Sequence, residues 1–467
     1  MMAVYCAVGM LVLFGLTIFV HELGHFLVAR ALGLVADVFS IGMGPAVWKR
    51  KIGGTTWQIG CLPIGGFVAL PQLDPNSFLE GRGGRSLPPA AAWKKILVAL
   101  AGAAGNIAFA FALGAVVWAV GKPMALSECN AVVGYVAADS AAEAAGIEEG
   151  DRIVSLDGAA VANWDGILNH TALSGSAEVL VEAEKPDGTR LSCVLPLEET
   201  ELGVKVLPGL DGMSLCLVAE VYPNSSAEAA GLRAGDWIVE FGGKELYGRG
   251  HLSKLVDRAA DEVTEIRFRR DGEMLAAAVK PQYDPALGRA LIGIMFNTQA
   301  DLDFAAKGHP TPWAQVKEHA GGIFRFLHAL ATPKTAGAAA GAVGGPVLIF
   351  VMFWTMLKLS WVMALWFTVF LNVNLAIVNL LPLPVLDGGQ VVLGLVEWVR
   401  RKPLPAAVVN TLVNTFAVLL IAVLLVLVYR DTIRSILPSA RRAFGPKAED
   451  PVPVIFGEPG DSPASAP

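Results

Sequence analysis

Four long runs of apolar residues without a charged side chain divide the chain. A helix that crosses a bilayer needs about 20 consecutive apolar residues, so each run predicts a transmembrane span. The expected spans cover residues 1–34, 96–121, 358–386 and 405–429. The first run lacks a basic start and a small-residue cleavage site, which are the marks of a signal peptide. We therefore expect a polytopic α-helical membrane protein with four transmembrane helices.

Basic residues predict the orientation of these spans. The segment 35–95 carries seven Lys and Arg residues against three acidic residues, and the segment 387–404 contains Arg400, Arg401 and Lys402. Short cytoplasmic loops are enriched in Lys and Arg, so both segments are predicted to be cytoplasmic. The region 122–340 is then periplasmic. The tail 430–467 would also be outside, although its first part is basic, and its Pro, Gly and Ser content predicts partial disorder.

A repeat organises the outer region. The stretch SAAEAAGIEEGDRIVSLDG at 140–158 returns as SAEAAGLRAGDWIVEFGG at 226–243, which aligns Gly146 with Gly231 at an offset of 85 residues. Each copy predicts short strands around a helical element that ends at a glycine. We expect two α+β modules, at 125–205 and 210–298, inserted between the second and third spans.

These modules resemble PDZ domains of the bacterial, circularly permuted kind. The resemblance implies that each can bind an extended peptide, or the outer part of a substrate, by adding it as a strand to a sheet edge. Modules that act only as spacers are the alternative. The linker 303–345 contains apolar residues at helical spacing from Trp313 to Leu330, which predicts an amphipathic helix on the outer membrane face or against the second module.

His21, Glu22 and His25 form an HELGH sequence at the end of the first apolar run. Residues i and i+4 share one face of a helix, so the two imidazoles can bind one Zn²⁺. Glu22 can then take a proton from the water that attacks the substrate. Ionisable groups at membrane depth are costly and mark functional sites, which weighs against two surface histidines and a glutamate without a role.

A catalytic zinc site needs a third protein ligand. The third run ends in NVNLAIVNLLPLPVLDGG, in which Asp387 is the first charge after nearly thirty residues. Pro382 and Pro384 predict the end of the helix, and irregular backbone at membrane depth is tolerated only inside protein or beside a wet cavity. Because the first and third spans run in the same direction, His25 and Asp387 should both lie near the cytoplasmic side.

HELGH, the N-x-x-P-x-P-x-L-D-G-G motif and the tandem modules resemble the site-2 protease family of intramembrane zinc metalloproteases, in particular its sigma-E-regulating type. The resemblance implies that His21, His25 and Asp387 bind Zn²⁺ and that Glu22 is the catalytic base. It also implies substrate contacts for three asparagines, namely Asn106, Asn374 and Asn379. Two positions depart from the family pattern, Ala103 for a proline and Gln390 for a histidine; neither is a ligand.

The segment 39–70 resembles the membrane-associated β-hairpin of the same family. It has β-prone residues around 55–59 and 67–70 between glycine-rich turns. A transmembrane substrate must be unwound before cleavage, and an exposed strand edge can hold the extended result. We expect this edge near Gln58 and Ile59, on the cytoplasmic side.

Composition agrees with a membrane enzyme. Hydrophobic residues make up 54% of the 467 residues and charged residues 17%, against about 25% charged in soluble domains. The net charge of −6 argues against a nucleic-acid partner. Five cysteines without a CxxC spacing predict neither a zinc finger nor a complete disulfide framework.

The expected function is hydrolysis of peptide bonds within transmembrane segments of single-pass proteins in a bacterial inner membrane. An anti-sigma factor or remnant signal peptides are the substrates that the resemblance implies, with the modules controlling access. Two alternatives are a membrane-anchored zincin that degrades misfolded proteins and a PDZ scaffold without activity. The zincin would need a glutamate ligand, and Glu397 is the nearest candidate.

Overall fold

A computed structural model describes the chain except for residues 74–86, 201–203, 286, 298–300 and 434–467. The tail predicted to be partly disordered lies outside the described residues from 434 onward. The chain divides into two compact units, which we describe separately. The membrane unit contains residues 1–110 and 342–467, and the module unit contains residues 111–341.

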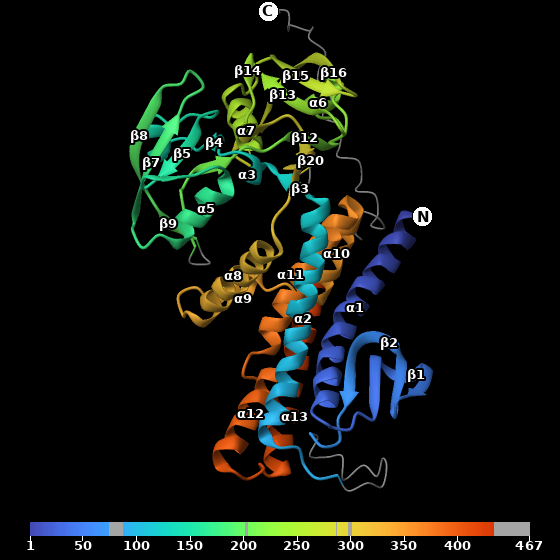
Figure 1. Cartoon of the computed structure of the whole chain (residues 1–467). Coiled ribbons are helices and arrows are strands. Elements are labelled where there is room, and N and C mark those ends of the chain that lie inside the picture. The colour runs from blue at the N-terminus through green and yellow to red at the C-terminus, as the bar shows by residue number, and fades with distance from the viewer. Residues whose placement is uncertain (74–86, 201–203, 286, 298–300, 434–467) are drawn as a thin grey trace, which may run out of the picture. The chain divides into compact units, whose positions relative to one another are not determined.

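Four helices in the described part of the chain are long and apolar enough to cross a membrane, which confirms the predicted number of spans. They are α1 (Met2–Ala31), α2 (Ala92–Val120), α11 (Trp361–Asn379) and α13 (Ala406–Asp431). A shorter apolar helix, α10 (Pro346–Leu359), precedes α11 (Figure 1). Ser360 separates these two helices, and its side chain accepts a hydrogen bond from the Val362 amide as the N-cap of α11.

The third span ends earlier than predicted. α11 stops at Asn379 and residues 380–386 form turns, because Pro382 and Pro384 cannot continue a helix. A further helix, α12 (Asp387–Arg400), begins at Asp387, where we expected only a loop. The sequence did not predict this helix because its first turn contains two glycines, Gly388 and Gly389, which usually indicate a turn.

The cytoplasmic hairpin of the prediction consists of β1 (Val38–Ile52) and β2 (Thr55–Ala69), which are antiparallel. The beginning of β1 pairs with β2 twice, with residues 56–59 on one side and residues 66–69 on the other. Residues 56–59 also pair with residues 48–51, so they lie inside the sheet. The expected free edge at Gln58 and Ile59 is therefore wrong; the segments 48–51 and 66–69 are the two edges.

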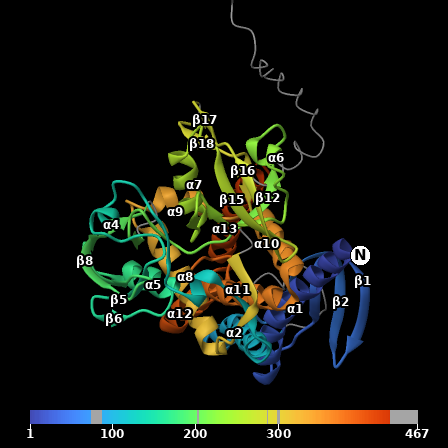
Figure 2. The ribbon, with the colours of Figure 1, turned by 90° about the horizontal axis from the view of Figure 1, so that it is seen from above.

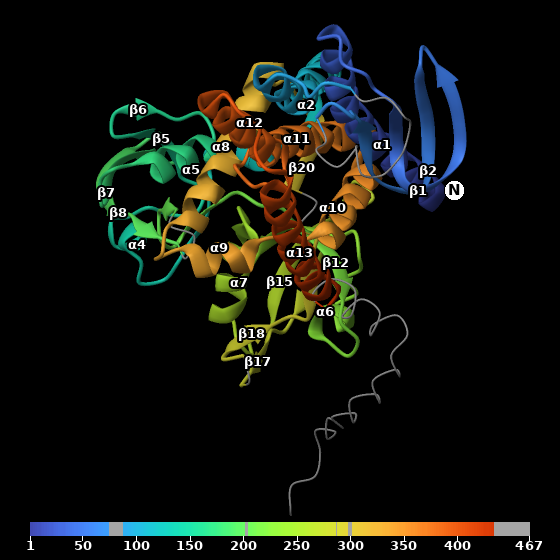
Figure 3. The same ribbon diagram turned by 90° about the horizontal axis from the view of Figure 1, so that it is seen from below.

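Aromatic side chains attach this sheet to α1. Phe39 is 1% exposed, and its ring lies 4.4 Å from that of Trp57 and 5.7 Å from that of Phe26 on α1. The ring of Phe19, two turns before Phe26 on the same face of α1, also lies 5.7 Å from the ring of Phe39. The hairpin consequently lies against α1 (Figure 3).

The module unit begins with the end of α2 and continues with β3 (Lys122–Ala125) and α3 (Leu126–Cys129); β3 pairs with β20 (Leu302–Gly308). The first module then contains β4 (Val133–Val136), α4 (Ala141–Ala144), β5 (Arg152–Leu156), β6 (Ala159–Ala160), α5 (Trp164–Leu173), β7 (Glu178–Glu184), β8 (Arg190–Pro196), β9 (Glu198–Glu199), β10 (Lys205–Val206) and β11 (Leu210–Gly212). One sheet has the order β6-β5-β7-β8. Alternating buried residues of β7, such as Val179 and Val181, face the core of this module.

The second module repeats this arrangement (Figure 2). It contains β12 (Cys216–Val221), α6 (Ser226–Ala229), β13 (Trp237–Phe241), β14 (Lys244–Glu245), α7 (Arg249–Arg258), β15 (Thr264–Arg270), β16 (Glu273–Val279), β17 (Gln282–Asp284), β18 (Arg289–Leu291) and β19 (Ile294–Phe296). The main sheet path is β16-β15-β13-β12-β19. Its core includes Ile238, Leu252 and Ile266, all at most 1% exposed.

The boundary between the modules differs from the predicted one. β11 pairs with β4, just as β19 pairs with β12, so the first module extends to Gly212 rather than to residue 205. The prediction missed this because β11 has only three residues, too few for a periodic pattern.

The predicted amphipathic helix is α8 (Pro312–Ala331), followed by α9 (Ala336–Ala342). In the described part of the chain this helix packs against α2, a partner that the sequence did not indicate. The Gln315 side chain donates to the carbonyl of Gly114 on α2 over 3.0 Å, and the ring of Trp313 stacks on Phe111 at 6.1 Å. Gly114 and Phe111 belong to the C-terminal half of α2, so α8 packs against this half of the helix.

Candidate metal and catalytic centre

The first helix brings two imidazoles to one face. His21 and His25 stand one turn apart on α1, and their rings lie 4.8 Å apart. α1 can approach α2 closely because Gly24 has no side chain; a Cβ there would lie 2.2 Å from the carbonyl oxygen of Ala101. The face of α1 that carries the two histidines therefore packs closely against α2.

The turn before α12 supplies the carboxylate. Asp387 is the first residue of α12, and the two glycines after it are required by close backbone contact rather than by a left-handed conformation. A Cβ at Gly388 would lie 2.3 Å from the carbonyl oxygen of Leu380, and one at Gly389 would lie 2.1 Å from that of Leu383. The chain thus folds tightly back on itself and presents the Asp387 carboxylate to α1.

Three ligand atoms converge within the membrane unit. His21 Nε2 and His25 Nε2 lie 3.3 Å and 3.4 Å from Asp387 Oδ2, and 3.3 Å from each other. Corners of a tetrahedron with bonds of about 2.0–2.1 Å lie about 3.3–3.4 Å apart, which is the spacing that Zn²⁺ requires. Among the described residues this is the group of His, Cys, Asp and Glu side chains that could hold a metal ion. Asp387 Oδ2 is buried and has no hydrogen-bond partner there, as suits a metal ligand.

The outward-facing nitrogens of both rings have partners of their own. His25 Nδ1 lies 2.7 Å from the carbonyl oxygen of Val98, so it carries the proton and leaves Nε2 free for a metal. His21 Nδ1 lies 3.2 Å from the Asn106 side-chain amide. Asn106 is fully buried and its Oδ1 has no partner among the described residues. Amide oxygen and nitrogen are interchangeable in assignment, and the flipped amide would let Oδ1 accept the His21 proton.

Gly102 on α2 lies directly against the pair of histidines. A Cβ there would lie 2.3 Å from His25 Nε2 and 2.7 Å from His21 Cε1. The absence of a side chain at this position keeps open the space in which the ligand atoms meet. The glycine-rich stretch around Gly102 is visible in the sequence and indicates a close helix contact. The sequence does not show that α1 is the helix in contact.

Glu22 lies on the neighbouring position of α1 and faces the hairpin. Gly66, in the edge segment of β2, is so close that a Cβ would lie 2.9 Å from Glu22 Cγ. The same atom would lie 2.9 Å from the carbonyl oxygen of Ser40, so the strand has no room to move away. The edge segment 66–69 therefore runs beside the candidate base.

The three asparagines lie in different environments. Asn106 lies against His21, as described, whereas Asn374 and Asn379 are half-buried on α11. The Oδ1 atom of Asn374 is buried without a partner among the described residues. An asparagine that the sequence reasoning did not single out, Asn372, is fully buried and donates to Thr17 Oγ1 of α1 over 3.0 Å. Asn372 thereby joins α11 to α1 one turn before His21.

Glu397 does not belong to this group. Its carboxylate lies 2.9 Å from Lys95 Nζ and accepts a second hydrogen bond from the Leu404 amide over 3.0 Å. The glutamate that a membrane-anchored zincin would need is therefore occupied by a structural ion pair.

Comparison with known proteins agrees with this geometry. The model of peptidase family M50 matches residues 9–423, so the chain belongs to this family. The Regulator of sigma-E protease RseP of Escherichia coli K12 is 27% identical over 460 residues, which cover 90% of this chain and 97% of that protein. A Neisseria meningitidis protein provisionally named a zinc metalloprotease is 27% identical over 433 residues, 89% and 96% of the two chains. A PDZ domain from Listeria innocua is 23% identical over 19% of this chain and 94% of its own, with a TM-score of 0.17.

The chain is accordingly a membrane metallopeptidase. Membership in family M50 and the similarity to zinc metalloproteases establish a zinc-dependent endopeptidase of the site-2 type. The four apolar helices and the similarity to RseP indicate a protein of the inner membrane. The predictions of an enzyme and of zinc as its cofactor are confirmed.

Proposed function

We propose that His21, His25 and Asp387 hold the zinc ion and that Glu22 is the general base. The observation that carries the proposal is the set of three distances between ligand atoms, 3.3–3.4 Å, which matches the edges of a zinc tetrahedron. When bound, zinc polarises the scissile carbonyl and makes a water molecule acidic enough to react near neutral pH. Glu22 accepts a proton from the attacking water and transfers it to the leaving amine.

The substrate is a transmembrane segment of a single-pass membrane protein. A helix conceals its peptide groups in its own hydrogen bonds, so it must unwind before a water can reach a carbonyl. The edge segment 66–69 of β2 can receive the unwound chain, because it is paired on one side only and its Gly66 borders Glu22. The extended substrate would then pass directly beside the base.

The asparagines take two roles in this proposal. The buried, unpartnered Oδ1 of Asn374 can accept a hydrogen bond from a peptide N–H of the unwound substrate, and Asn379 can contact the substrate at the end of α11. Asn106 instead orients His21, since its amide contacts Nδ1 of that ring. A partner of this kind fixes the tautomer and the direction of a metal-binding histidine.

The orientation follows from the positive charges of the loops. Segments 35–95 and 387–404 are basic and lie on the cytoplasmic side, so the metal centre is near that side and the modules are periplasmic. The modules control which substrates reach the membrane unit. An anti-sigma factor, as the name of RseP suggests for that relative, or remnant signal peptides would be substrates of the required kind.

Trapping tests the substrate class. The Glu22→Gln variant, expressed in native membranes, should retain uncleaved single-span proteins, which cross-linking and mass spectrometry would identify. Wild-type protein is the control, because it would release cleaved products. Recovery of soluble or multi-span proteins alone would contradict the proposed substrate class.

A further inference from the structure

Helix α12 carries an apolar face that is exposed at the surface of the membrane unit. Val392, Leu395, Val396 and Val399 recur at the spacing i, i+3, i+4 and i+7, which places them on one side of the helix. Their exposed fractions are 41%, 42%, 39% and 83%, respectively. We call these four residues the apolar face of α12. A contiguous exposed face of this kind marks a contact with a partner or with lipid.

The opposite side of α12 packs against α2. A Cβ at Gly394 would lie 2.9 Å from Ile96 Cγ1, and the Glu397 carboxylate lies 2.9 Å from Lys95 Nζ. Rotation of α12 about its axis would separate this ion pair and drive larger side chains into Ile96. The helix is therefore fixed with its apolar face directed away from α2.

α12 runs along α2 toward the beginning of that helix. Asp387 lies beside the two histidines, which border Gly102, whereas Glu397 lies beside Lys95 near the first residue of α2. In the proposed orientation, this end of α2 is cytoplasmic. α12 consequently extends from the depth of the candidate metal centre to the cytoplasmic surface of the bilayer. Its apolar face reaches the inner edge of the hydrocarbon layer.

Two exposed tryptophans mark the level of the membrane surface. Trp398 near the end of α12 is 60% exposed, and Trp93 near the beginning of α2 is 46% exposed. Tryptophan is enriched at both interfaces of a membrane, where its amphipathic ring lies among the headgroups. The end of α12 is thus placed at the level of the phospholipid headgroups.

Three consecutive basic residues follow at this level. We call Arg400, Arg401 and Lys402, all of which are exposed, the basic triad. Arg401 ends the helix in a left-handed conformation with φ of 53°, which glycine adopts more readily than any other residue. A long cationic side chain therefore stands where the backbone alone would favour glycine.

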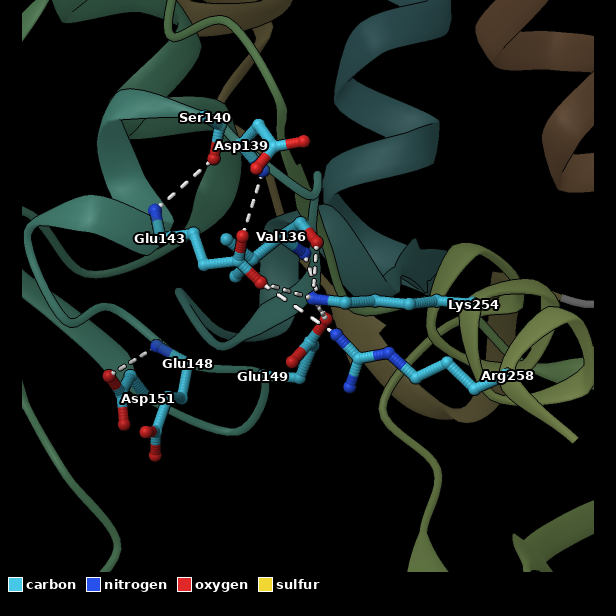
Figure 4. A network of polar contacts seen from close by, with 9 residues as sticks. All are labelled: Val136, Asp139, Ser140, Glu143, Glu148, Glu149, Asp151, Lys254 and Arg258. Atoms are coloured by element: carbon cyan, nitrogen blue, oxygen red, sulfur yellow. Dashed lines mark hydrogen bonds and ion pairs between the residues drawn. The ribbon is translucent and has the colours of Figure 1, made fainter.

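The lysine between the two modules shows how the chain pairs a cation internally. Lys254 on α7 donates to the carbonyl of Val136 over 2.9 Å and lies 3.2 Å from Glu143 and 3.1 Å from Glu149 (Figure 4). Its charge is compensated within the protein. By contrast, no ion pair between described residues includes a member of the basic triad. The three charges of the triad are therefore open to an anion from outside the chain.

We propose that α12 and the basic triad bind an anionic phospholipid of the cytoplasmic leaflet. An acyl chain lies along the apolar face, and the phosphate of the headgroup accepts hydrogen bonds from the basic triad at the end of the helix. A net negative headgroup is preferred over a zwitterionic one, because three positive charges meet it and no acidic side chain opposes them. The inference rests on the proposed function for the cytoplasmic orientation of α12.

Photo-cross-linking on the full chain tests this site. Two tracers would carry the same photoactivatable acyl chain, one with a phosphatidylglycerol and one with a phosphatidylcholine headgroup. Each would be added to the chain in phosphatidylcholine nanodiscs, and mass spectrometry would identify the labelled peptides. We expect the phosphatidylglycerol tracer to label residues 387–402 at least about tenfold more, because each basic side chain near an anionic lipid surface contributes roughly a factor of five to affinity.

Substitutions separate the headgroup from the acyl chain. The triple variant Arg400→Gln, Arg401→Gln, Lys402→Gln should reduce the headgroup preference to about twofold or less. Val399→Asn should instead lower labelling by both tracers at least about twofold and leave their ratio unchanged, because it removes apolar contact with the chain. Val47→Asn is the control for Val399→Asn, at a valine of β1 that is 74% exposed.

A matched control for the triple variant removes the same charge from β1, on the same side of the membrane. It consists of three substitutions at exposed positions, Lys49→Gln, Arg50→Gln and Lys51→Gln, and should leave the headgroup preference unchanged. Equal labelling of the wild-type chain by the two tracers, an unchanged preference in the triad variant, or an equal loss in the β1 control would overturn the proposal.

A soluble competitor distinguishes a lipid from a free phosphate. Glycerol phosphate added to the nanodiscs should leave labelling by the phosphatidylglycerol tracer unchanged. Loss of labelling would show a site for a free phosphate and would also overturn the proposal. Labelling is measured without cleavage, so a normal headgroup preference in a chain that cleaves no transmembrane substrate would contradict the proposed function alone.

Discussion

Asp387 Oδ2 lies 3.3 Å from His21 Nε2, although one residue opens α12 and the other lies in α1. The contact depends on two close approaches of backbone, at Gly24 between α1 and α2 and at Gly388 in the turn before α12. A cluster of two imidazoles and a carboxylate inside apolar helices has no benefit for stability that packing could not supply better. The proposed metal centre accounts for this arrangement.

Asp387→Asn should weaken zinc binding. The amide keeps the shape of the side chain but loses the charge that the metal needs. Loss of an outer-shell partner costs roughly 10–100-fold in metal affinity, and loss of a ligand should cost more. Competition with a zinc chelator, followed by metal analysis of the purified protein, measures this. A variant with wild-type affinity would show that Asp387 is not a ligand.

Gly102→Ala should remove zinc from an otherwise folded protein. The new methyl group would lie 2.3 Å from His25 Nε2, so at least one imidazole must leave its position. Gly15→Ala is the control, since a Cβ at Gly15 on α1 meets nothing within 4 Å. Zinc content and thermal unfolding of both variants would be compared. Full zinc content in Gly102→Ala would contradict the described packing of α1 and α2.

Asn106→Leu should reduce zinc affinity by roughly 10–100-fold, because His21 loses the partner that orients its ring. Asn106→Asp, which keeps an acceptor oxygen for the ring proton, should restore most of the affinity. If Asn106 contacts the substrate instead, both variants would bind zinc normally and show a raised KM. Zinc titration and cleavage kinetics together separate the two roles.

Gly66→Ala should slow cleavage without loss of zinc. A Cβ there would lie 2.9 Å from Glu22 Cγ, so the base or the strand must shift. Misplacement of a catalytic group by about 1 Å can cost on the order of 100-fold in rate. The rate on a model transmembrane substrate and the zinc content are the two measurements. An unchanged cleavage rate would show that the edge segment 66–69 takes no part in the reaction.

The sequence was sufficient for features that depend on local spacing. HELGH places two histidines on one helical face, and the prolines before Asp387 end a helix, so both halves of the candidate centre could be predicted. Contacts between distant elements could not be predicted in the same way. The partner of Asn106, the position of Gly66 beside Glu22 and the packing of α8 on α2 depend on which faces of helices meet.

The hairpin illustrates the same limit. Its β-prone residues and glycine-rich turns predicted a strand pair, but the choice of edge depends on pairing register. Because β1 pairs with both halves of β2, the segment around Gln58 is enclosed and the segment around Gly66 is free. A substitution intended to probe the edge therefore belongs at 66–69.

The most direct test of the account is the cleavage rate of Glu22→Gln, measured with its zinc content. Purified wild-type and variant protein would be reconstituted in lipid vesicles with a single-span model substrate. The account predicts full zinc occupancy and a cleavage rate lower by about 100-fold or more, because general acid–base catalysis typically contributes 10²–10⁴-fold. Cleavage by Glu22→Gln at the wild-type rate would contradict the assignment of Glu22 as the base.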